Sequence, residues 1–337
     1  MKAVVVGDGG WGTALALLLR ENGHAVTLWS PFPAYAEELR TRRENPLYLP
    51  GVPLPPDLPI TSDPAEAAHG AGLAVLAVPS RYFAEVLARF HGLLAPDVLA
   101  VSVAKGFDPA SGRRLSEIAE QLLGLPAVAV LSGPSHAEEV ARGVPTAVVA
   151  AARDTAASVR VQDAFVNDRF RVYTHHDVIG VELGGAMKNV IALAAGACDG
   201  IGFGDNTKAA LCTRGLAEMT RLGVAMGAKR ETFFGLSGVG DLIVTAFSRH
   251  SRNRAFGERV GRGERPEAVL ASTATVAEGV RTTKSAWQMA CRFSVEMPIT
   301  REVYATLYEG KSPKEALRDL MGREPKPEFV ISPRDCS

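Results

Sequence analysis

The sequence has few cysteines, no excess of either charge and no long uninterrupted apolar run. Its four cysteines, Cys198, Cys212, Cys291 and Cys336, lie far apart, with no C-x-x-C pair and no histidine cluster beside them. This spacing favours neither a zinc site nor a disulfide framework, and it is typical of a protein of the reducing cytosol. We therefore expect no bound metal.

The absence of net charge excludes further classes of protein. The 37 Lys and Arg residues balance the 37 Asp and Glu residues, so the bulk attraction of a nucleic-acid binder or a polybasic membrane-surface protein is missing. No apolar run is expected to reach the ~18 residues of a membrane span, and the chain enters an apolar strand at once, without the pattern of a signal peptide. We expect a cytoplasmic protein with no nucleic-acid partner and no membrane insertion. An anionic small molecule stays open as a ligand.

The first half of the chain alternates short Val-rich runs with helical stretches. Residues 2–6, 12–22 and 25–29 describe one strand-helix-strand unit. Later runs have the composition of strands that are buried on both faces of a parallel sheet. These runs are 73–78, 98–103, 127–131, 146–150 and 171–174. The Pro-rich stretch 50–59 is typical of a surface loop.

The composition changes after about residue 178. Val-rich runs stop, and Ala/Leu/Gly/Met segments with helical spacing follow, such as 178–197 and 208–226. A chain of 337 residues is long enough for two domains. We predict an α/β protein in which an N-terminal Rossmann-type domain with a mostly parallel sheet, residues 1–178, precedes an all-helical substrate-binding domain, residues 179–337.

A glycine-rich turn connects the first predicted strand to the first predicted helix. Residues 7–12, Gly-Asp-Gly-Gly-Trp-Gly, fit G-x-G-x-x-G, in which glycines allow a tight turn and close approach to a pyrophosphate at the helix N-terminus. A strand-helix turn without a ligand is the alternative. We predict NAD or NADP binding, with Trp11 shielding the pyrophosphate or packing in the core. The predicted cofactor-binding glycines are Gly7, Gly9, Gly10 and Gly12.

The sequence leaves the choice between NAD and NADP undetermined. An acidic residue about 20 positions after the glycines would hold the ribose 2′-hydroxyl of NAD, and an arginine there would accept the phosphate of NADP. The second strand is followed by Ser30, Pro31 and Phe32, which offer neither. Asp8 would repel a pyrophosphate unless its side chain points away, so its replacement by alanine is expected to tighten cofactor binding.

Several separated motifs occur together in a fixed order. Beside the glycine turn they are residues 45–51 (NPLYLPG), 78–80 (VPS), 105–107 (KGF), 132–135 (SGPS), 182–189 (ELGGAMKN), 238–242 (GVGDL), 251–253 (SRN) and 276–279 (VAEG). In these motifs the chain resembles bacterial NAD(P)-dependent glycerol-3-phosphate dehydrogenase, from Met1 to about Met321. The resemblance implies reversible hydride transfer between the nicotinamide and the pair dihydroxyacetone phosphate and sn-glycerol 3-phosphate, which supplies glycerol 3-phosphate for phospholipid synthesis.

The resemblance also implies roles for individual residues. It makes Lys188 the catalytic acid/base. It places substrate contacts at Lys105, Gly133, Ser135, Lys188, Asp241, Ser251, Arg252 and Asn253, the last three as donors to the phosphate. Beside the glycine turn it places cofactor contacts at Pro31, Lys105, Ala137, Arg252, Val276 and Glu278.

The chemistry of ketone reduction agrees with a catalytic lysine. The forming alkoxide needs a proton donor, and a lysine whose pKa is lowered by burial can act as one. The alternative for Lys188 is an exposed lysine with a buried stem, and for Lys105 a solvated loop lysine. His136 stands where the family usually has Phe, and histidine is a common acid/base. Nothing else in the sequence places a carboxylate to orient His136, so we favour Lys188.

Other interpretations stay open at this stage. Asp241 could be a helix cap, and Glu278 by itself reads as a surface helix residue. The protein could be another two-domain dehydrogenase, acting on a hydroxy acid or ketopantoate, which would need a cation for the substrate carboxylate. It could also be a cofactor-binding redox sensor without turnover, although such a sensor needs no proton donor. A homodimer is common for such folds.

Overall fold

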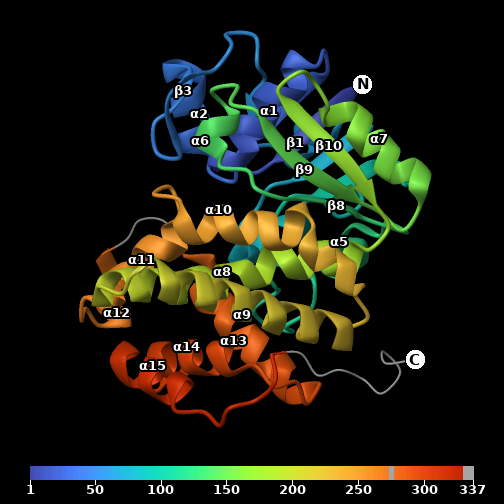
Figure 1. Cartoon of the computed structure of the whole chain (residues 1–337). Helices are drawn as coiled ribbons and strands as arrows, with labels where there is room; N and C mark the ends of the chain where they lie inside the picture. Colours follow the sequence, from blue (N-terminus) through green and yellow to red (C-terminus); the bar gives the residue numbers. More distant parts are fainter. Residues whose placement is uncertain (273–276, 329–337) are drawn as a thin grey trace.

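A computed structural model describes residues 1–272 and 277–328, and it has a sheet part followed by a helical part (Figure 1). The main sheet has eight strands in the order β10-β9-β8-β7-β6-β1-β2-β5. They are β1 (Lys2–Val6), β2 (Ala25–Trp29), β5 (Ile60–Thr61), β6 (Leu73–Leu76), β7 (Leu99–Ser102), β8 (Ala129–Ser132), β9 (Thr146–Ala151) and β10 (Phe170–His175). Six neighbouring strands of this sheet, β5-β2-β1-β6-β7-β8, follow the Rossmann order 3-2-1-4-5-6. The predicted fold class is therefore confirmed.

Helices cover both faces of this sheet. They are α1 (Gly10–Glu21), α2 (Pro33–Arg42), α3 (Pro64–Ala68), α4 (Phe83–Ala88), α5 (Leu115–Leu123), α6 (Ala137–Val140) and α7 (Thr155–Phe165), with a 3-10 turn η1 (Ser80–Tyr82). Val5 of β1 belongs to the apolar cluster that includes Leu15 of α1, whereas Val4 belongs to the cluster that includes Phe83 of α4. Alternate residues of one strand thus enter two cores, which explains why the strands read as continuous apolar runs.

Two sequence interpretations of the sheet part are corrected. The run 146–150 reads as a strand of a parallel sheet, and β9 is indeed parallel to β10, but it pairs antiparallel with β8. The Pro-rich stretch 50–59 is more than a surface loop, because β4 (Leu49–Pro53) pairs with β3 (Glu44–Asn45) and Leu54 and Leu58 are buried. Leucine anchors in an otherwise proline-rich stretch hold it against the sheet part.

The part after residue 178 is helical, as predicted. Its elements are α8 (Val178–Ile201), α9 (Asp205–Ala225), η2 (Arg230–Phe234), the π-helical turn η3 (Leu236–Gly240), α10 (Asp241–Phe247), α11 (Arg252–Gly261), α12 (Pro266–Ser272), α13 (Glu278–Arg292), α14 (Pro298–Tyr308) and α15 (Pro313–Met321). Helix α8 runs through the middle of this part, between the sheet and α13 (Figure 1). It packs closely on α11, because a Cβ at Gly196 would lie 1.9 Å from the carbonyl oxygen of Arg254.

Helix α8 is long and apolar enough to cross a membrane by length and composition alone, with a mean hydropathy of 1.5 over its most apolar window. The sequence was expected to hold no apolar run of this length; Glu182 and Lys188 interrupt the segment, but its mean hydropathy stays high. In the structure 89% of that window is buried inside the protein. The helix is therefore accounted for as the core of the helical part.

A buried ionic contact ties α8 to the sheet part. Arg114 Nη1 lies 2.7 Å from Glu182 Oε2, and the Glu182 carboxylate also accepts hydrogen bonds from the backbone N–H and the hydroxyl of Ser116 at 2.9 and 2.6 Å. Glu182 thus satisfies an N–H at the start of α5 as a capping side chain would. We call this group the Arg114–Glu182 clamp.

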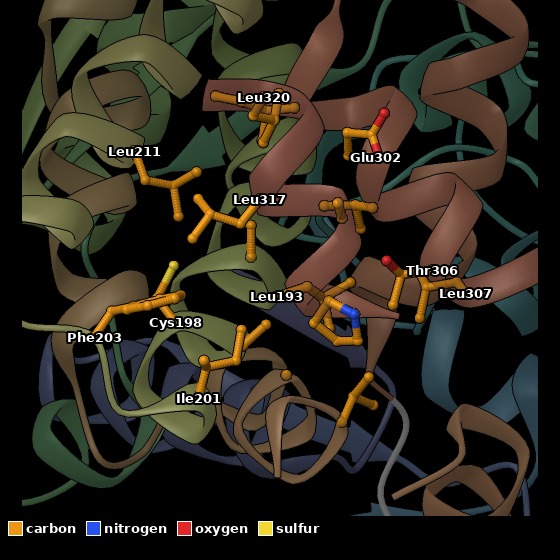
Figure 2. Close-up of a pocket in the computed structure, with 18 of the residues that line it drawn as sticks. Leu193, Cys198, Ile201, Phe203, Leu211, Glu302, Thr306, Leu307, Leu317 and Leu320 are labelled. Atoms are coloured by element: carbon orange, nitrogen blue, oxygen red, sulfur yellow. The ribbon is translucent and has the colours of Figure 1, made fainter. Parts of the chain in front are cut away.

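An apolar cavity lies among α8, α9, α11, α14 and α15 (Figure 2). It is lined by leucine, phenylalanine and alanine side chains, including Leu193, Leu211 and Leu317. None of the site residues predicted from the sequence lines it. A phosphorylated substrate needs cationic or N–H donors, which this lining lacks.

The described cysteines form no disulfide. Cys198 and Cys212 are buried and Cys291 is exposed, while Cys336 lies outside the described residues. Burial raises the pKa of Cys198 and of Cys212 to about 11, so both thiols stay protonated and unreactive near neutral pH. Within residues 1–272 and 277–328 no group of three or more His, Cys, Asp and Glu side chains could hold a metal ion.

Candidate active site

The predicted site residues of the sheet part gather at one edge of the sheet. Gly7 follows β1, Pro31 follows β2, Lys105 follows β7, and Gly133 and Ser135 follow β8. These strands run parallel, so their carboxyl ends lie at the same edge. The order of the strands reverses at β1, which has β2 on one side and β6 on the other, and ligands of open α/β sheets bind at such a switch point.

The glycine turn has the shape of a phosphate cradle. Gly7 has φ +115°, and a Cβ at Gly12 would lie 2.0 Å from the carbonyl oxygen of Gly7, so both positions require glycine. Gly9 is the N-cap of α1, which has no side-chain cap and no acidic residue in its first turn. A Cβ at Gly9 would meet no atom of the protein within 4 Å. The N-cap of α1 therefore borders open space, and an uncapped helix N-terminus of this kind fits the pyrophosphate of a dinucleotide.

We predict that Gly9→Ala weakens NADH binding on the order of tenfold while leaving Tm unchanged. The added methyl group would stand where the pyrophosphate approaches, and it contacts nothing in the protein. Gly204→Ala is the matched control, because Gly204 is the N-cap of α9 and also faces open space. Fluorescence titration with NADH measures the effect, and equal affinities of the two variants would contradict the prediction.

Asp8 lies within this turn, and its carboxylate is hydrogen-bonded to the residue that follows β2. Its Oδ2 accepts a hydrogen bond of 2.6 Å from the Ser30 hydroxyl, at the end of β2. Asp8 is 5% exposed, and burial raises its pKa while the hydrogen bond from Ser30 opposes the rise. The side chain is thus turned toward β2. This is the arrangement in which Asp8 need not repel a pyrophosphate.

The centre of the site is a group of two lysines and one aspartate, the Lys188–Asp241–Lys105 cluster. Lys188 Nζ donates to Asp241 Oδ1, and Lys105 Nζ lies 2.8 Å from Asp241 Oδ2. Lys105 also donates to the carbonyl oxygen of Gly133 at 2.9 Å and lies 3.5 Å from the Ser135 hydroxyl. Asp241 is fully buried and Lys188 is 6% exposed. The exposed-lysine alternative for Lys188 and the cap alternative for Asp241 therefore do not describe this structure.

Glycines in α8 allow the cluster to assemble. A Cβ at Gly184 would lie 2.5 Å from the carbonyl oxygen of Ser237, in the π-helical turn η3 that leads into Asp241. A Cβ at Gly185 would lie 2.6 Å from the Ser132 hydroxyl and 3.5 Å from Cγ of Lys105. The small residues before Lys188 thus admit the end of β8 and the turn that carries Asp241.

Burial controls the ionisation of the central lysine. Desolvation lowers the pKa of Lys188 to about 7, aided by the neighbouring charge of Lys105, while Asp241 acts in the opposite direction. A lysine with this pKa holds and releases a proton at neutral pH.

His136 is the second titratable group at this place, and it is half-buried at the start of α6. Burial and the charges of Lys188 and Lys105 lower its pKa, while Glu138 and Glu139 oppose this effect. Its Nε2 is buried without a hydrogen-bond partner in the described part of the chain, and its ring lies 5.7 Å from that of His250. No carboxylate is hydrogen-bonded to the ring among the described residues.

The helical part brings a carboxylate to the sheet edge. Glu278, the first residue of α13, accepts hydrogen bonds from the backbone N–H of Ser80 at 3.2 Å and from the Ser80 hydroxyl. Burial raises the pKa of Glu278, and the nearby charge of Arg252 opposes the rise. Glu278 is therefore not a free surface residue of its helix. Val276, predicted as its neighbour in the cofactor site, lies outside the described residues.

The predicted phosphate donors lie at the start of α11. Ser251 is the N-cap, and its Oγ accepts the N–H of Arg254 at 3.2 Å, which leaves its own O–H to donate. Arg252 is exposed. Asn253 is engaged within the protein, because its Nδ2 donates to Asn189 Oδ1 and its Oδ1 accepts the N–H of Gly279, both at 2.9 Å.

Three further residues predicted to bind the cofactor are Trp11, Ala137 and Pro31. Trp11 packs against the sheet core with its ring 6.5 Å from that of Phe170, and its Nε1 is buried without a partner in the described residues. Ala137 begins α6 and lies beside Gly10. The carbonyl oxygen of Pro31 accepts a hydrogen bond of 3.4 Å from Arg89.

Comparison with known proteins identifies the family. The model of the NAD-dependent glycerol-3-phosphate dehydrogenase N-terminus matches residues 2–158, and that of the C-terminus of the same family matches residues 177–318. The chain belongs to this NAD-dependent glycerol-3-phosphate dehydrogenase family. As a member of the family it is an oxidoreductase that uses NAD or NADP.

Relatives of the dehydrogenase family match almost the whole chain. Glycerol-3-phosphate dehydrogenase [NAD(P)+] of Prosthecochloris aestuarii is 51% identical over 98% of this chain and 100% of its own length. The corresponding protein of Chlorobium phaeobacteroides is 50% identical over 98% of this chain and 99% of its own length. The crystal structure of glycerol-3-phosphate dehydrogenase from Coxiella burnetii has a TM-score of 0.92 and 38% identity, covering 96% of this chain and 99% of the other.

Some polar residues that contact the predicted site residues or hold α8 in place were assigned no role from the sequence. Ser80 was seen only as part of a motif, although it holds Glu278, and Asn189 was given no role beside Asn253. The Arg114–Glu182 clamp was also unforeseen. Polar residues inside the motifs 78–80 and 182–189 were the signal that could have pointed to them, because buried polar side chains need partners.

Proposed function

We propose that this chain interconverts dihydroxyacetone phosphate and sn-glycerol 3-phosphate, with Lys188 as general acid/base. The observation that carries the proposal is the Lys188–Asp241–Lys105 cluster, which is buried and stands at the carboxyl edge of a Rossmann sheet. The relatives are glycerol-3-phosphate dehydrogenases, which supports glycerol 3-phosphate as the substrate. The N-terminal unit, residues 1–178, would hold the cofactor, and the helical unit, residues 179–337, would supply Lys188 and the phosphate donors.

The cluster's geometry supports a division of roles. Protonated Lys188 would donate to the forming alkoxide, and in the reverse direction neutral Lys188 would take the proton of the hydroxyl. Asp241 accepts from both lysines and so fixes the direction of each Nζ. Lys105, held by the carbonyl oxygen of Gly133, would place its positive charge beside the substrate oxygen. Nicotinamide, when bound, supplies or accepts the hydride.

The remaining predicted residues have supporting positions. Ser251 and Arg252 would donate to the substrate phosphate, and Asn253 would keep one N–H for it while orienting Asn189. Gly133 and Ser135 would contact the substrate beside Lys105. The cofactor would lie along Gly7, Gly9, Gly10, Trp11, Gly12, Pro31, Lys105, Ala137, Arg252, Val276 and Glu278.

The wider setting follows from the same family resemblance. A cytoplasmic enzyme with this activity would supply the glycerol phosphate backbone of membrane phospholipids, and we propose that it acts as a homodimer.

A substrate panel tests the proposed activity. The purified protein is mixed with NADH or NADPH and with dihydroxyacetone phosphate, ketopantoate or pyruvate, and loss of the reduced nicotinamide absorbance is followed. We expect oxidation with dihydroxyacetone phosphate only. Turnover of a keto acid instead would favour the hydroxy-acid alternative, and binding of both cofactors without turnover would favour a sensor.

We predict that Asp241→Asn moves the pH dependence of the reaction to lower pH. Asp241 raises the pKa of Lys188 against the effect of burial, so its neutralisation lowers that pKa further below about 7. Reduction of dihydroxyacetone phosphate needs protonated Lys188, so kcat/KM for reduction would begin to fall at a lower pH than in the unsubstituted enzyme. Asp199→Asn is the control, because Asp199 pairs with Lys208 outside the cluster. A shift toward higher pH would refute the assigned proton donor.

A further inference from the structure

The end of β2 has a carboxylate that the sequence of β2 does not supply. Ser30, the residue after β2, is fully buried and donates its hydroxyl to Asp8 Oδ2 at 2.6 Å. Asp8 itself belongs to the turn between β1 and α1. A residue next to the phosphate cradle thus brings its acid group to the neighbouring strand, where Rossmann proteins that bind NAD carry their acidic residue.

Neighbouring side chains hold the backbone of Asp8 in place. Its carbonyl oxygen accepts hydrogen bonds from Asn45 Nδ2 at 2.7 Å and from the Thr13 hydroxyl at 3.2 Å. Asn45 in turn accepts from the Tyr35 hydroxyl at 2.7 Å. Because Ser30 occupies only Oδ2, and no hydrogen bond to Oδ1 occurs within the described residues, Oδ1 keeps its capacity to accept.

On the proposed function, we infer that Asp8 makes this enzyme prefer NAD over NADP. Its Oδ1 would accept a hydrogen bond from the 2′-hydroxyl of the adenosine ribose. In NADP that hydroxyl carries a phosphate, which can donate no such bond at neutral pH and whose charge the carboxylate repels. Ser30 acts as a positioning residue, since its hydroxyl sets the direction of the Asp8 side chain.

The cation that could oppose this preference is Arg89. Its Nη1 donates to the carbonyl oxygen of Pro31 at 3.4 Å, and its guanidinium lies 4.7 Å from the centre of the Trp29 ring. Side chains alternate between the two faces of a strand. Trp29 joins the apolar cluster of α4, whereas Leu28 joins that of α1, so Ser30 and Asp8 lie on the α1 face with the cradle. Arg89 is held on the opposite face.

Binding of the two reduced cofactors, measured by their fluorescence without substrate, tests the inference. We expect the unsubstituted enzyme to bind NADH more tightly than NADPH, and Asp8→Asn to narrow the ratio of the two Kd values on the order of tenfold, since it removes the charge but keeps the size. Ser30→Ala should narrow the ratio in the same direction, because the carboxylate loses its orientation. Arg89→Ala, the control, should leave the ratio unchanged.

Three results would contradict a role of Asp8 in cofactor preference. Tighter binding of NADPH by the unsubstituted enzyme, a ratio that neither Asp8→Asn nor Ser30→Ala alters, or loss of NADPH binding in Arg89→Ala would overturn the inference. Should Asp8→Asn fail to fold, Ser30→Ala decides alone. The ratio is measured without substrate, so failure to reduce dihydroxyacetone phosphate would count against the proposed function and leave the cofactor preference standing.

Discussion

Replacement of Lys188 by methionine is expected to lower kcat for the reduction of dihydroxyacetone phosphate about 10²–10⁴-fold, the usual contribution of a positioned acid/base. Methionine keeps an unbranched side chain of similar length but carries no proton. Within the described residues Lys188 forms its hydrogen bond with Asp241 and none with the glycine turn before α1, so the affinity for NADH should stay the same. Single-turnover oxidation of bound NADH measures the loss directly.

Lys208→Met is the matched control for this result. Lys208 is also buried, at 8% exposure, and it pairs with Asp199 of α8 at 2.7 Å, but it stands apart from the Lys188–Asp241–Lys105 cluster. The substitution Lys208→Met removes a lysine–aspartate pair that joins α9 to α8, so any general effect of losing such a pair at α8 appears in both variants. Equal losses of kcat in the two variants would show that Lys188 has a structural role only.

The second large effect is expected from Glu182→Ala, which should lower the free energy of unfolding by about 3–5 kcal/mol. Arg114 is 7% exposed, and the substitution leaves its guanidinium without the Glu182 carboxylate. The N–H and hydroxyl of Ser116 lose their acceptor at the same time. Thermal and urea denaturation measure the change.

An exposed ion pair provides the comparison for Glu182. Glu37→Ala breaks the pair with Arg40, whose side chains are 65% and 43% exposed, and exposed pairs contribute about 0–1 kcal/mol. A destabilisation by Glu182→Ala as small as that of Glu37→Ala would mean that the Arg114–Glu182 clamp does not hold α8 to the sheet part.

The positions of the buried strands could be predicted from the sequence, because strands covered on both faces consist mostly of apolar residues. Strands β1 and β2 were placed at their observed bounds, since both faces of each are covered and both read as apolar runs. The antiparallel pairing of β9 was not predictable in this way. Parallel and antiparallel neighbours inside a buried sheet present the same apolar surface, and the direction depends on how the chain returns, which composition does not record.

Part of the candidate site could be predicted from the sequence and part could not. The glycine turn could be interpreted from its own residues, because Gly7 and Gly12 are required by backbone geometry. Lys188 and Asp241 were linked by family resemblance alone, since their contact joins residues 53 positions apart. Nothing in the sequence showed that Asp8 turns toward Ser30. A side chain's direction depends on partners brought together by folding, and local patterns do not contain them.

The pH dependence of the reaction in both directions tests the central claim most directly. The pKa of buried Lys188 is about 7 in the free enzyme. If Lys188 is the acid/base, kcat/KM for reduction of dihydroxyacetone phosphate should fall as pH rises through this pKa. Oxidation of sn-glycerol 3-phosphate should rise through the same pKa, because it needs the neutral amine. Two profiles that change together, or that stay flat between about pH 6 and 8, would contradict the assignment of Lys188 as the proton donor.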